Sequence, residues 1–432
     1  KIKFIEHHLA HASAAYYGCP WVKNDEKILI LTQDGSGDGL SGTVNIGYEG
    51  KIERVGEITK ENSLGRLYAT VTFMLGMIPL EHEYKLMGMA PYAPEQGREI
   101  AYEFFKKVLS IKDGEITIKR NKKLPPMQMI YPHIRKGTEF LRFDWIAAGI
   151  QKLTEEILVK WVKNCISHTG INKIVLSGGT FMNVKANQKI SELKEVENIF
   201  IFPSCGDESN SLGAAYSDYY SRNQNAKIKG ISHLYLGTNI LNDNRCEDEI
   251  KNLEAKKSTS FEYQYHENVE LKIAELLASG KIIARCKGKM EFGARALGNR
   301  SILSDASDLN KITVINNMIK NRDFWMPFAP VILEERSQDY VKNPKDIDCP
   351  YMIMTLHSSA NYKEFIGGVQ QMDLTARPQM INERQNKNYY TILKEYERLT
   401  GKGVLINTSF NLHGLPIVYG PKEAIHVFEN SG

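Results

Sequence analysis

Strand-like runs alternate with helical stretches along nearly the whole chain, and this alternation constrains the fold more than any other feature. Residues 27–58 read as strand, turn, strand, turn, strand, because short β-rich runs are separated by glycine-containing turns. Residues 143–170 have the apolar spacing of a long helix that ends on a glycine, and 173–177 and 198–204 read as buried strands. This order of elements predicts an α/β protein.

Length and a local rise in polarity predict two domains. A chain of 432 residues is too long for one average hydrophobic core. Polarity rises in "RNQNAKIKG", residues 222–230, so we place the domains at 1–225 and 226–432. In the second domain we expect a helix at 267–280, a strand at 281–286, and a loop-rich stretch from there to the end.

Composition excludes several classes of partner. The 55 basic and 51 acidic residues give a net charge of +4, which does not indicate the concentrated basic face of a nucleic-acid-binding protein. There is no signal peptide and no apolar run of about 18 residues, so we expect no membrane partner. No C-x-x-C pattern is present, and we expect a reduced, cytoplasmic protein with free thiols. The six cysteines are Cys19, Cys165, Cys205, Cys246, Cys286 and Cys349.

The stretch "EHHLAHASAAYYG", residues 6–18, places His7 and His11 four residues apart. Residues with this spacing share one face of a helix, so the pair can offer two imidazoles to one metal ion. In the alternative interpretation, one histidine caps or packs and the other is solvated. The spacing alone leaves both interpretations open.

The stretch "QDGSGDG", residues 33–39, is a glycine-rich turn between two strands. Its exposed N–H groups can cradle phosphate, and Asp34 can hold a cation beside it. A calcium loop is excluded because the twelfth position is Asn45 where a glutamate is required. A dinucleotide fingerprint is excluded because a strand and not a helix follows. A plain hairpin turn remains an alternative.

Two further stretches offer polar groups where strands end. In "LSGGTFMN", residues 176–183, Gly178 and Gly179 bring bare main chain to a helix start, which suits phosphate or ribose. In "PSCGDESNSLGAAY", residues 203–216, Asp207 precedes a helix of small residues that can pack closely on a neighbour. A tight turn without ligand is the alternative for the first stretch, and a helix N-cap is the alternative for Asp207.

Other glycine-rich blocks carry cations and amides suited to phosphate or carboxylate groups. They are "EYKLMGMAPYA", "GKMEFGARALGNRSIL", "DLTARPQ" and "INTSFNLHG". An ordinary surface salt-bridge cluster is the alternative for the second of them. The candidate residues in these blocks are Lys85, Lys289, Arg295, Arg300, Arg377, Asn407 and Ser409.

The order of these motifs resembles the NodU/CmcH family of O-carbamoyltransferases. The resemblance rests on "HHLAHASAAYY", "DGSGDG", "SLGRLYATVT", "KLMGMAPY", "LSGGTFMNVKAN", "GDESNSLGAAY", "EFGARALGNRSI", "DLTARPQ" and "NTSFNLHGLPIV", and covers essentially the whole chain. It implies an actin/sugar-kinase-like ATPase domain of the ribonuclease H-like class, which we expect to be incomplete at its N-terminus, followed by a YrdC-like α/β domain.

The resemblance also implies an activity. Carbamoyl phosphate and ATP would form a carbamoyl-adenylate in the second domain, and the carbamoyl group would pass to a hydroxyl of a sugar or natural product at a metal site in the first. The implied metal ligands are His7, His11, Asp34 and Asp207, of which the first three are also candidate catalytic residues. Iron is the favoured metal, with manganese or zinc as alternatives. Magnesium is a possible companion of ATP, and a homodimer is left open.

The resemblance and the patterns above together give one set of candidate residues for nucleotide and phosphate binding. They are Gly35, Ser36, Gly37, Lys85, Gly178, Gly179, Asn183, Lys289, Arg295, Arg300, Arg377, Asn407 and Ser409.

Three positions depart from the family pattern. Ala294 stands where proline is usual, Leu374 where glycine is usual, and His413 where arginine is usual, which removes a permanent cation. Two alternative functions therefore stay open. One is a sugar or acetate kinase of the same ATPase fold, and the other is a degenerate nucleotide-binding protein without catalysis.

Overall fold

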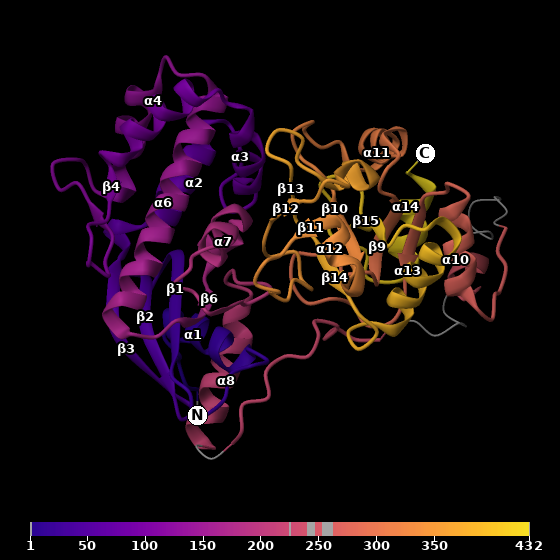
Figure 1. Ribbon diagram of the computed structural model, residues 1–432, viewed down its shortest axis with the longest axis horizontal. Helices are drawn as coiled ribbons and strands as arrows, with labels where there is room; N and C mark the ends of the chain where they lie inside the picture. Colours follow the sequence, from indigo (N-terminus) through magenta and orange to yellow (C-terminus); the bar gives the residue numbers. More distant parts are fainter. Residues whose placement is uncertain (1, 224–225, 240–246, 253–261, 432) are drawn as a thin grey trace. The chain divides into compact units, whose positions relative to one another are not determined.

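The computed structural model describes residues 2–223, 226–239, 247–252 and 262–431 (Figure 1). The chain forms two compact units, Lys1–Ser232 and His233–Gly432. The predicted boundary at 225–226 falls shortly before the division between them. Residues 224–225 at that boundary, and Cys246, lie outside the described residues.

The first unit is built on a five-stranded sheet with the order β3-β2-β1-β6-β7. Its first three strands are consecutive and antiparallel, which confirms the pattern predicted for residues 27–58. β6 pairs in parallel with β1, and β7 in parallel with β6, so the carboxyl ends of β1, β6 and β7 lie at one edge of the sheet. The strands are β1 (Ile28–Gly37), β2 (Leu40–Tyr48), β3 (Lys51–Thr59), β6 (Lys173–Ser177) and β7 (Asn198–Ile201).

Helices and a small hairpin surround this sheet. The predicted long helix is α6, and it ends at a left-handed glycine, Gly170, as the sequence indicates. α1 packs on β1 and β6, and α2 also contacts β1. The helices are α1 (His7–Gly18), α2 (Leu64–Met74), α3 (Glu83–Met89), α4 (Glu95–Lys106), α5 (Tyr131–Thr138), α6 (Phe143–Thr169), α7 (Val184–Ser191) and α8 (Ser209–Arg222), and the hairpin strands are β4 (Leu109–Ser110) and β5 (Lys119–Arg120).

Close packing of α1 on α8 explains the small residues of "SLGAAY". A Cβ atom on Gly213 would lie 1.9 Å from the carbonyl oxygen of Ala10, so no larger residue fits at this crossing. The prediction that this helix packs closely on a neighbour is confirmed. The contact fixes the start of α8 beside the histidines of α1, which positions the candidate site.

The second unit contains a five-stranded sheet with the order β14-β10-β15-β9-β8. All neighbouring pairs are antiparallel except β10 with β14. The strands are β8 (Ile283–Cys286), β9 (Arg300–Asp305), β10 (Ala329–Leu333), β14 (Gln379–Ile381) and β15 (Val404–Ser409), and a smaller sheet holds β11 (Val341–Lys342), β12 (Leu356–Ser358) and β13 (Thr375–Ala376). The helices are α10 (Val269–Ala278), α11 (Leu309–Ile315), α12 (Ser337–Tyr340), α13 (Lys387–Thr400) and α14 (Pro421–Glu429).

The predictions of α10 and β8 are confirmed, but the stretch after residue 286, which we expected to be loop-rich, also contains strands and helices that were not predicted. The central strands are short and buried on both faces. Leu303, for example, belongs to the core beneath α10 and α13, while its neighbour Ile302 belongs to the core on the opposite face. Such strands lack the alternation of apolar and polar residues that marks a half-exposed strand, so periodicity does not reveal them.

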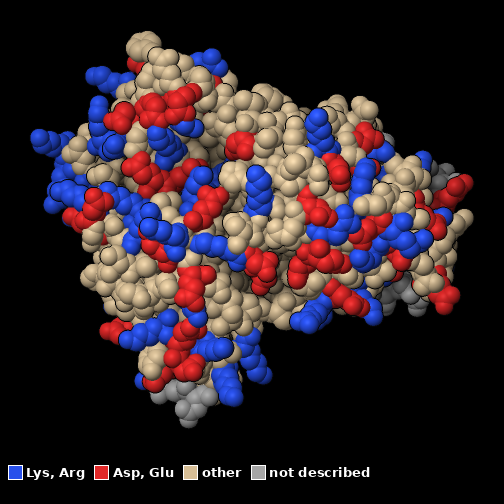
Figure 2. Space-filling model, viewed as in Figure 1, with Lys and Arg blue, Asp and Glu red and all other residues tan. Residues whose placement is uncertain are grey.

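The surface carries both signs of charge. Figure 2 shows Lys and Arg side chains interspersed with Asp and Glu over the face drawn. Among the helices that the structure describes, none combines the length and the apolar character needed to cross a membrane.

Candidate metal centre

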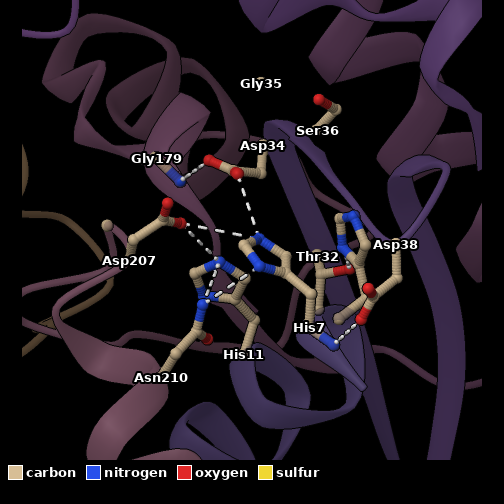
Figure 3. A network of polar contacts seen from close by, with 12 residues as sticks. His7, His11, Thr32, Asp34, Gly35, Ser36, Asp38, Gly179, Asp207 and Asn210 are labelled. Atoms are coloured by element: carbon tan, nitrogen blue, oxygen red, sulfur yellow. Dashed lines mark hydrogen bonds and ion pairs between the residues drawn. The ribbon is translucent and has the colours of Figure 1, made fainter.

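Three loops at the carboxyl edge of the first sheet meet the start of α1 (Figure 3). Asp34 lies near the end of β1, Gly179 follows β6, and Asp207 follows β7. In open α/β sheets, ligands bind at the carboxyl ends of the strands. The topology therefore collects these polar groups at the edge where a binding site is expected.

The four predicted ligand residues lie together. His7 Nε2 is 3.2 Å from Asp34 Oδ2 and 3.5 Å from Asp207 Oδ1. His11 Nε2 is 3.4 Å from the same Asp207 oxygen. Each of the four residues offers one ligand atom, and all four atoms lie within 4.8 Å of one another. Two imidazoles and two carboxylates form a donor set that fits iron, manganese or zinc.

The alternative roles considered for the histidines and for Asp207 do not occur. Glu6 caps α1 by accepting the N–H of Leu9, so neither histidine is the cap. The His11 side chain is fully buried and that of His7 is 18% exposed. At α8 the cap position is Glu208, and no side chain caps the helix. Asp207 instead faces the two imidazoles.

The turn after Asp34 is both a hairpin and part of the site. Asp38 and Gly39 have φ values of 47° and 85°, as a two-residue hairpin turn requires. The pairing of β1 with β2 is interrupted between Gln33 and Gly37, and Asp34 lies in this irregular segment. Asp38 Oδ2 also accepts the main-chain N–H of His7 at 2.8 Å, which ties the turn to the first turn of α1.

Gly37 provides the space that the His7 imidazole occupies. A Cβ atom at position 37 would lie 2.1 Å from His7 Cγ, far inside van der Waals contact. On the other side of the site, the N–H of Gly179 donates to Asp34 Oδ1 at 2.9 Å. This bond fixes the carboxylate and leaves Oδ2 directed at His7.

The electrostatics favour a charged pair at the centre of the site. The hydrogen bond with Asp34 raises the pKa of His7, and the charges of Asp34, Asp207 and Asp38 act in the same direction against burial. Burial by itself would raise the pKa of Asp34, but His7, His11 and the Gly179 amide hold it well below its usual range. A metal ion at this position would replace the shared proton as the partner of the carboxylate.

The predicted nucleotide residues of the first unit lie nearby but make contacts of their own. Ser36 Oγ accepts hydrogen bonds from Arg66 Nε and Nη2 at 3.1 and 2.5 Å. Asn183 caps α7 by accepting the N–H of Ala186. Lys85 is half-buried on α3, and Gly35 and Gly178 are part of the loops described above. Nucleotide binding by these residues stays a prediction.

Sequence reasoning missed three polar side chains around the histidines. His11 Nδ1 is 3.2 Å from Ser209 Oγ and 3.4 Å from Ser177 Oγ. Asn210 Nδ2 is 3.4 Å from both His7 Nδ1 and His11 Nε2. Their positions in the sequence could have indicated them. Ser177 directly precedes Gly178, and Ser209 and Asn210 follow Asp207 at the start of α8.

A second polar cluster, the Lys320 cluster, lies in the second unit and consists of Lys320, Arg322, Thr408, Ser409 and Asn411. The π-helical turn η5 (Asn316–Lys320) ends at Lys320, whose Nζ donates to oxygens of Ser409 and Asn411 at 2.5–3.1 Å. Arg322 Nη2 donates to Thr408 Oγ1 at 3.1 Å. The four oxygens that accept hydrogen bonds from Lys320 Nζ are neutral. Burial, and then Arg322, lower the pKa of Lys320 to about 6.

Ser409 belongs to one of the sequence motifs, whereas Lys320 belongs to none of them. The stretch "IKNRDFW" gives no local sign that this lysine is buried, because lysines are mostly exposed. Burial of a cation among neutral acceptors leaves its charge uncompensated within the cluster. An anion such as a phosphate group would supply the missing charge.

The guanidinium of Arg300, a predicted phosphate ligand, makes its hydrogen bonds within the protein. Its guanidinium is fully buried and donates five hydrogen bonds to main-chain carbonyls of Lys287, Gly288, Asn299 and Tyr419. These bonds use every N–H of the group. Arg300 therefore holds the chain segments of this block together and has no donor left for phosphate.

Three main-chain amides of the same block are also occupied. Glu291 Oε1 accepts the N–H groups of Leu297, Asn299 and Arg300 at 2.8, 2.8 and 3.2 Å. A carboxylate of the protein thus takes the place that an anionic ligand would occupy in an empty nest of amides. A ligand of this block therefore cannot use these three N–H groups.

Asn407 links the motif loops. Its Nδ2 donates to Ala296 O and to Gln379 Oε1, so it joins "GARALGNR" to "ARPQ". Asn407 is buried, and both of its donors are used. Lys289 is exposed, whereas Arg295 and Arg377 are half-buried, and anion binding by these three residues stays a prediction.

The three departures from the family pattern have different structural settings. Leu374 has a φ of 53°, a left-handed conformation that glycine adopts without strain. This explains why glycine suits the position. Ala294 and His413 are exposed, and His413 contributes its main-chain N–H to the carbonyl of Ile319, a bond that arginine could make equally well.

Comparison with protein families identifies the class. Residues 1–216 match the model described as the carbamoyltransferase N-terminus, and residues 274–432 match the carbamoyltransferase C-terminus. The chain therefore belongs to the carbamoyltransferase family and is a transferase by class. This membership favours carbamoyl transfer over the kinase alternative.

Individual relatives agree with this assignment. The chain is similar to nodulation protein NolNO of Sinorhizobium fredii, with 30% identity over 99% of this chain and 62% of the relative. It is similar to NolO of Bradyrhizobium diazoefficiens, with 29% identity over 98% and 76%. It is also similar to the uncharacterized protein MJ1058 of Methanocaldococcus jannaschii, with 32% identity over 99% and 71%.

A solved structure of full-length HypF in the phosphate- and nucleotide-bound form overlaps with a TM-score of 0.29 at 16% identity. The overlap covers 49% of this chain and 35% of that one. A likeness at this level supports no argument about the fold.

Proposed function

We propose that this protein is an O-carbamoyltransferase that uses carbamoyl phosphate and ATP to carbamoylate a hydroxyl group of a sugar or natural product by way of a carbamoyl-adenylate. The observation that carries the proposal is the separation of two kinds of site. His7, His11, Asp34 and Asp207 form a metal-type site in the first unit, whereas the second unit contains the Lys320 cluster, which suits a phosphate group.

The sheet of the first unit supports a ribonuclease H-like ATPase domain. Among the five strands in the order β3-β2-β1-β6-β7, only β2 runs opposite to the others. The mixed sheet of the second unit, with its buried Lys320 cluster, is the part that we assign to the YrdC-like domain. The proposed acceptor class, a sugar or natural product, rests on the resemblance of the ordered motifs to O-carbamoyltransferases.

In the first unit we propose iron as the metal, with manganese or zinc as alternatives. A bound metal ion would polarise the carbonyl of the carbamoyl group. Asp34 and the histidines are held by Gly179, Asp38 and the packing of α1, so the donors are preorganised. The Asp207 side chain is 71% exposed and can meet incoming ligands.

In the second unit, the charge of Lys320 would attract the phosphate groups of ATP during formation of the adenylate, because its N–H groups already bond to Ser409 and Asn411. Transfer then forms a bond between the acceptor oxygen and the carbamoyl carbon. The bond from that carbon to the phosphate oxygen breaks, AMP leaves with the electron pair, and the hydroxyl proton is released. Positioning the two reactants supplies much of the rate increase in such a step.

Two assays on the full chain separate the half-reactions. Exchange of pyrophosphate into ATP that depends on carbamoyl phosphate reports adenylate formation, and mass spectrometry of candidate acceptors reports transfer. We expect His11→Ala to abolish transfer but not exchange, and Lys320→Met to abolish both. His168→Ala, on the exposed end of α6, is the matched control and should preserve both. Equal loss of exchange and transfer in His11→Ala would refute the division into two sites.

Metal content is tested independently of activity. Elemental analysis of the purified protein should find iron, manganese or zinc, and Asp207→Ala should contain less. Equal metal content in both proteins would exclude Asp207 as a ligand. A complete lack of metal in both would refute the site.

A further inference from the structure

Asn210, in the first turn of α8, faces both imidazoles of the candidate metal centre (Figure 3). Its Nδ2 is 3.4 Å from His7 Nδ1 and 3.4 Å from His11 Nε2. Its Oδ1 is buried and has no hydrogen-bond partner among the described residues. A buried amide oxygen without a partner is unfavourable, so this side chain needs an explanation.

The positions of the protons on the two histidines explain the placement of the Asn210 side chain. His7 Nε2 and His11 Nε2 are the nitrogens directed at the carboxylates, so they are the atoms that would bind a metal. A neutral imidazole that binds metal through Nε2 carries its proton on Nδ1, and that N–H requires an acceptor. For His11, the hydroxyl groups of Ser209 and Ser177 lie within reach of Nδ1.

For His7, the amide of Asn210 is the polar group beside Nδ1. An amide nitrogen cannot accept a hydrogen bond from this N–H, whereas the amide oxygen can. The two ends of an asparagine amide are nearly equal in size, and their assignment follows from the surrounding hydrogen bonds. Turning the amide by half a revolution places Oδ1 at Nδ1–H. The same rotation gives the oxygen a donor and moves the amide N–H group to the position that the oxygen held.

We propose that Asn210 is a positioning residue that accepts the Nδ1–H of His7 and so holds this imidazole in the tautomer that binds metal through Nε2. The inference rests on the proposed metal site and adds to it a residue that acts through the His7 imidazole. Outer contacts of this kind fix the orientation of a ligand ring and increase its affinity for the ion.

The test measures Zn²⁺ affinity of the full chain by competition with a chelator, after metal has been removed. Asn210→Leu keeps the size but removes the acceptor and should lower the affinity about 10- to 100-fold. Asn210→Asp restores an acceptor oxygen and should bind Zn²⁺ at least as tightly as the wild type. Ser211→Ala is the control, because Ser211 is exposed and bonds only to Glu208 O.

Thermal unfolding separates positioning from a structural role. We expect the metal-free Tm of Asn210→Leu to match that of the wild type, while the rise in Tm caused by Zn²⁺ becomes smaller. Wild-type affinity in Asn210→Leu, or failure of Asn210→Asp to bind as the wild type does, would overturn the inference and leave the metal site intact. A wild-type protein that binds no metal would overturn both.

Discussion

We predict that the second unit takes up a proton when ATP binds to it, because the side chain of Lys320 is mostly neutral at pH 8. Burial, and then the charge of Arg322, lower the pKa of Lys320 to about 6 in the free protein. A phosphate group beside Nζ favours the charged form and raises this pKa again. Above pH 6 the lysine must therefore gain a proton when the phosphate binds.

The expected pH dependence of ATP binding follows from the lowered pKa of Lys320. With a pKa of about 6, roughly one molecule in a hundred carries the charge at pH 8. Protonating Lys320 at that pH costs about 2.7 kcal/mol, since each pKa unit corresponds to about 1.4 kcal/mol. The apparent affinity for ATP should fall by up to about tenfold for each pH unit above 6, and proton uptake should approach one.

Isothermal titration calorimetry at pH 8 in two buffers of different ionisation enthalpy measures the uptake directly. Lys320→Met cannot take up this proton. Subtracting the proton uptake of Lys320→Met from that of the wild type therefore cancels the protons that the nucleotide itself binds. Lys281→Met, at an exposed position, is the control and should behave as the wild type. Equal proton uptake by the wild type and Lys320→Met would refute the reasoning, even if both proteins bind ATP.

Three further changes have defined outcomes. Gly37→Ala should abolish metal retention, because the new Cβ would lie 2.1 Å from His7 Cγ, whereas Gly35→Ala meets nothing within 4 Å and should retain metal in the same elemental analysis. Leu374→Gly should stabilise the second unit by on the order of 0.5–1 kcal/mol in urea unfolding. The reason is that relief of the left-handed strain at this position exceeds the conformational freedom that glycine adds to the unfolded chain. A loss of stability would contradict this prediction. Gly213→Ala should destabilise the first unit by about 1–3 kcal/mol in the same urea unfolding, because the new Cβ would lie 1.9 Å from a carbonyl oxygen of α1. An unchanged unfolding midpoint would show that α1 and α8 can separate to make room for it.

Local patterns determined much of the first unit. The three consecutive strands, the long helix α6 and the parallel strand β6 all follow from spacing and glycine positions. These signals are readable because β3 and α6 have one polar side and because turns require particular residues. In the second unit β8 was predicted, whereas the central strands β9, β10 and β15 were not, because both of their faces are buried and they lack the alternation of apolar and polar residues.

The sequence by itself also supplied the chemistry of the candidate metal centre. Helical spacing set His7 and His11 on one face, and the resemblance of ordered motifs to a family of carbamoyltransferases pointed to Asp34 and Asp207. What it could not supply was the surroundings of those groups. His11 and Ser209 are separated by 198 residues, and only the return of the chain through β7 and α8 brings them together.

The tertiary structure alone decided which polar residues are available to ligands. Arg300 and Lys320 are both cations near glycines or amides in the sequence, yet the structure directs the donors of Arg300 to main-chain carbonyls and those of Lys320 to neutral oxygens of Ser409 and Asn411. The physical reason is that a side chain's charge and donors are properties of its type, whereas its burial and partners depend on segments far away in the chain.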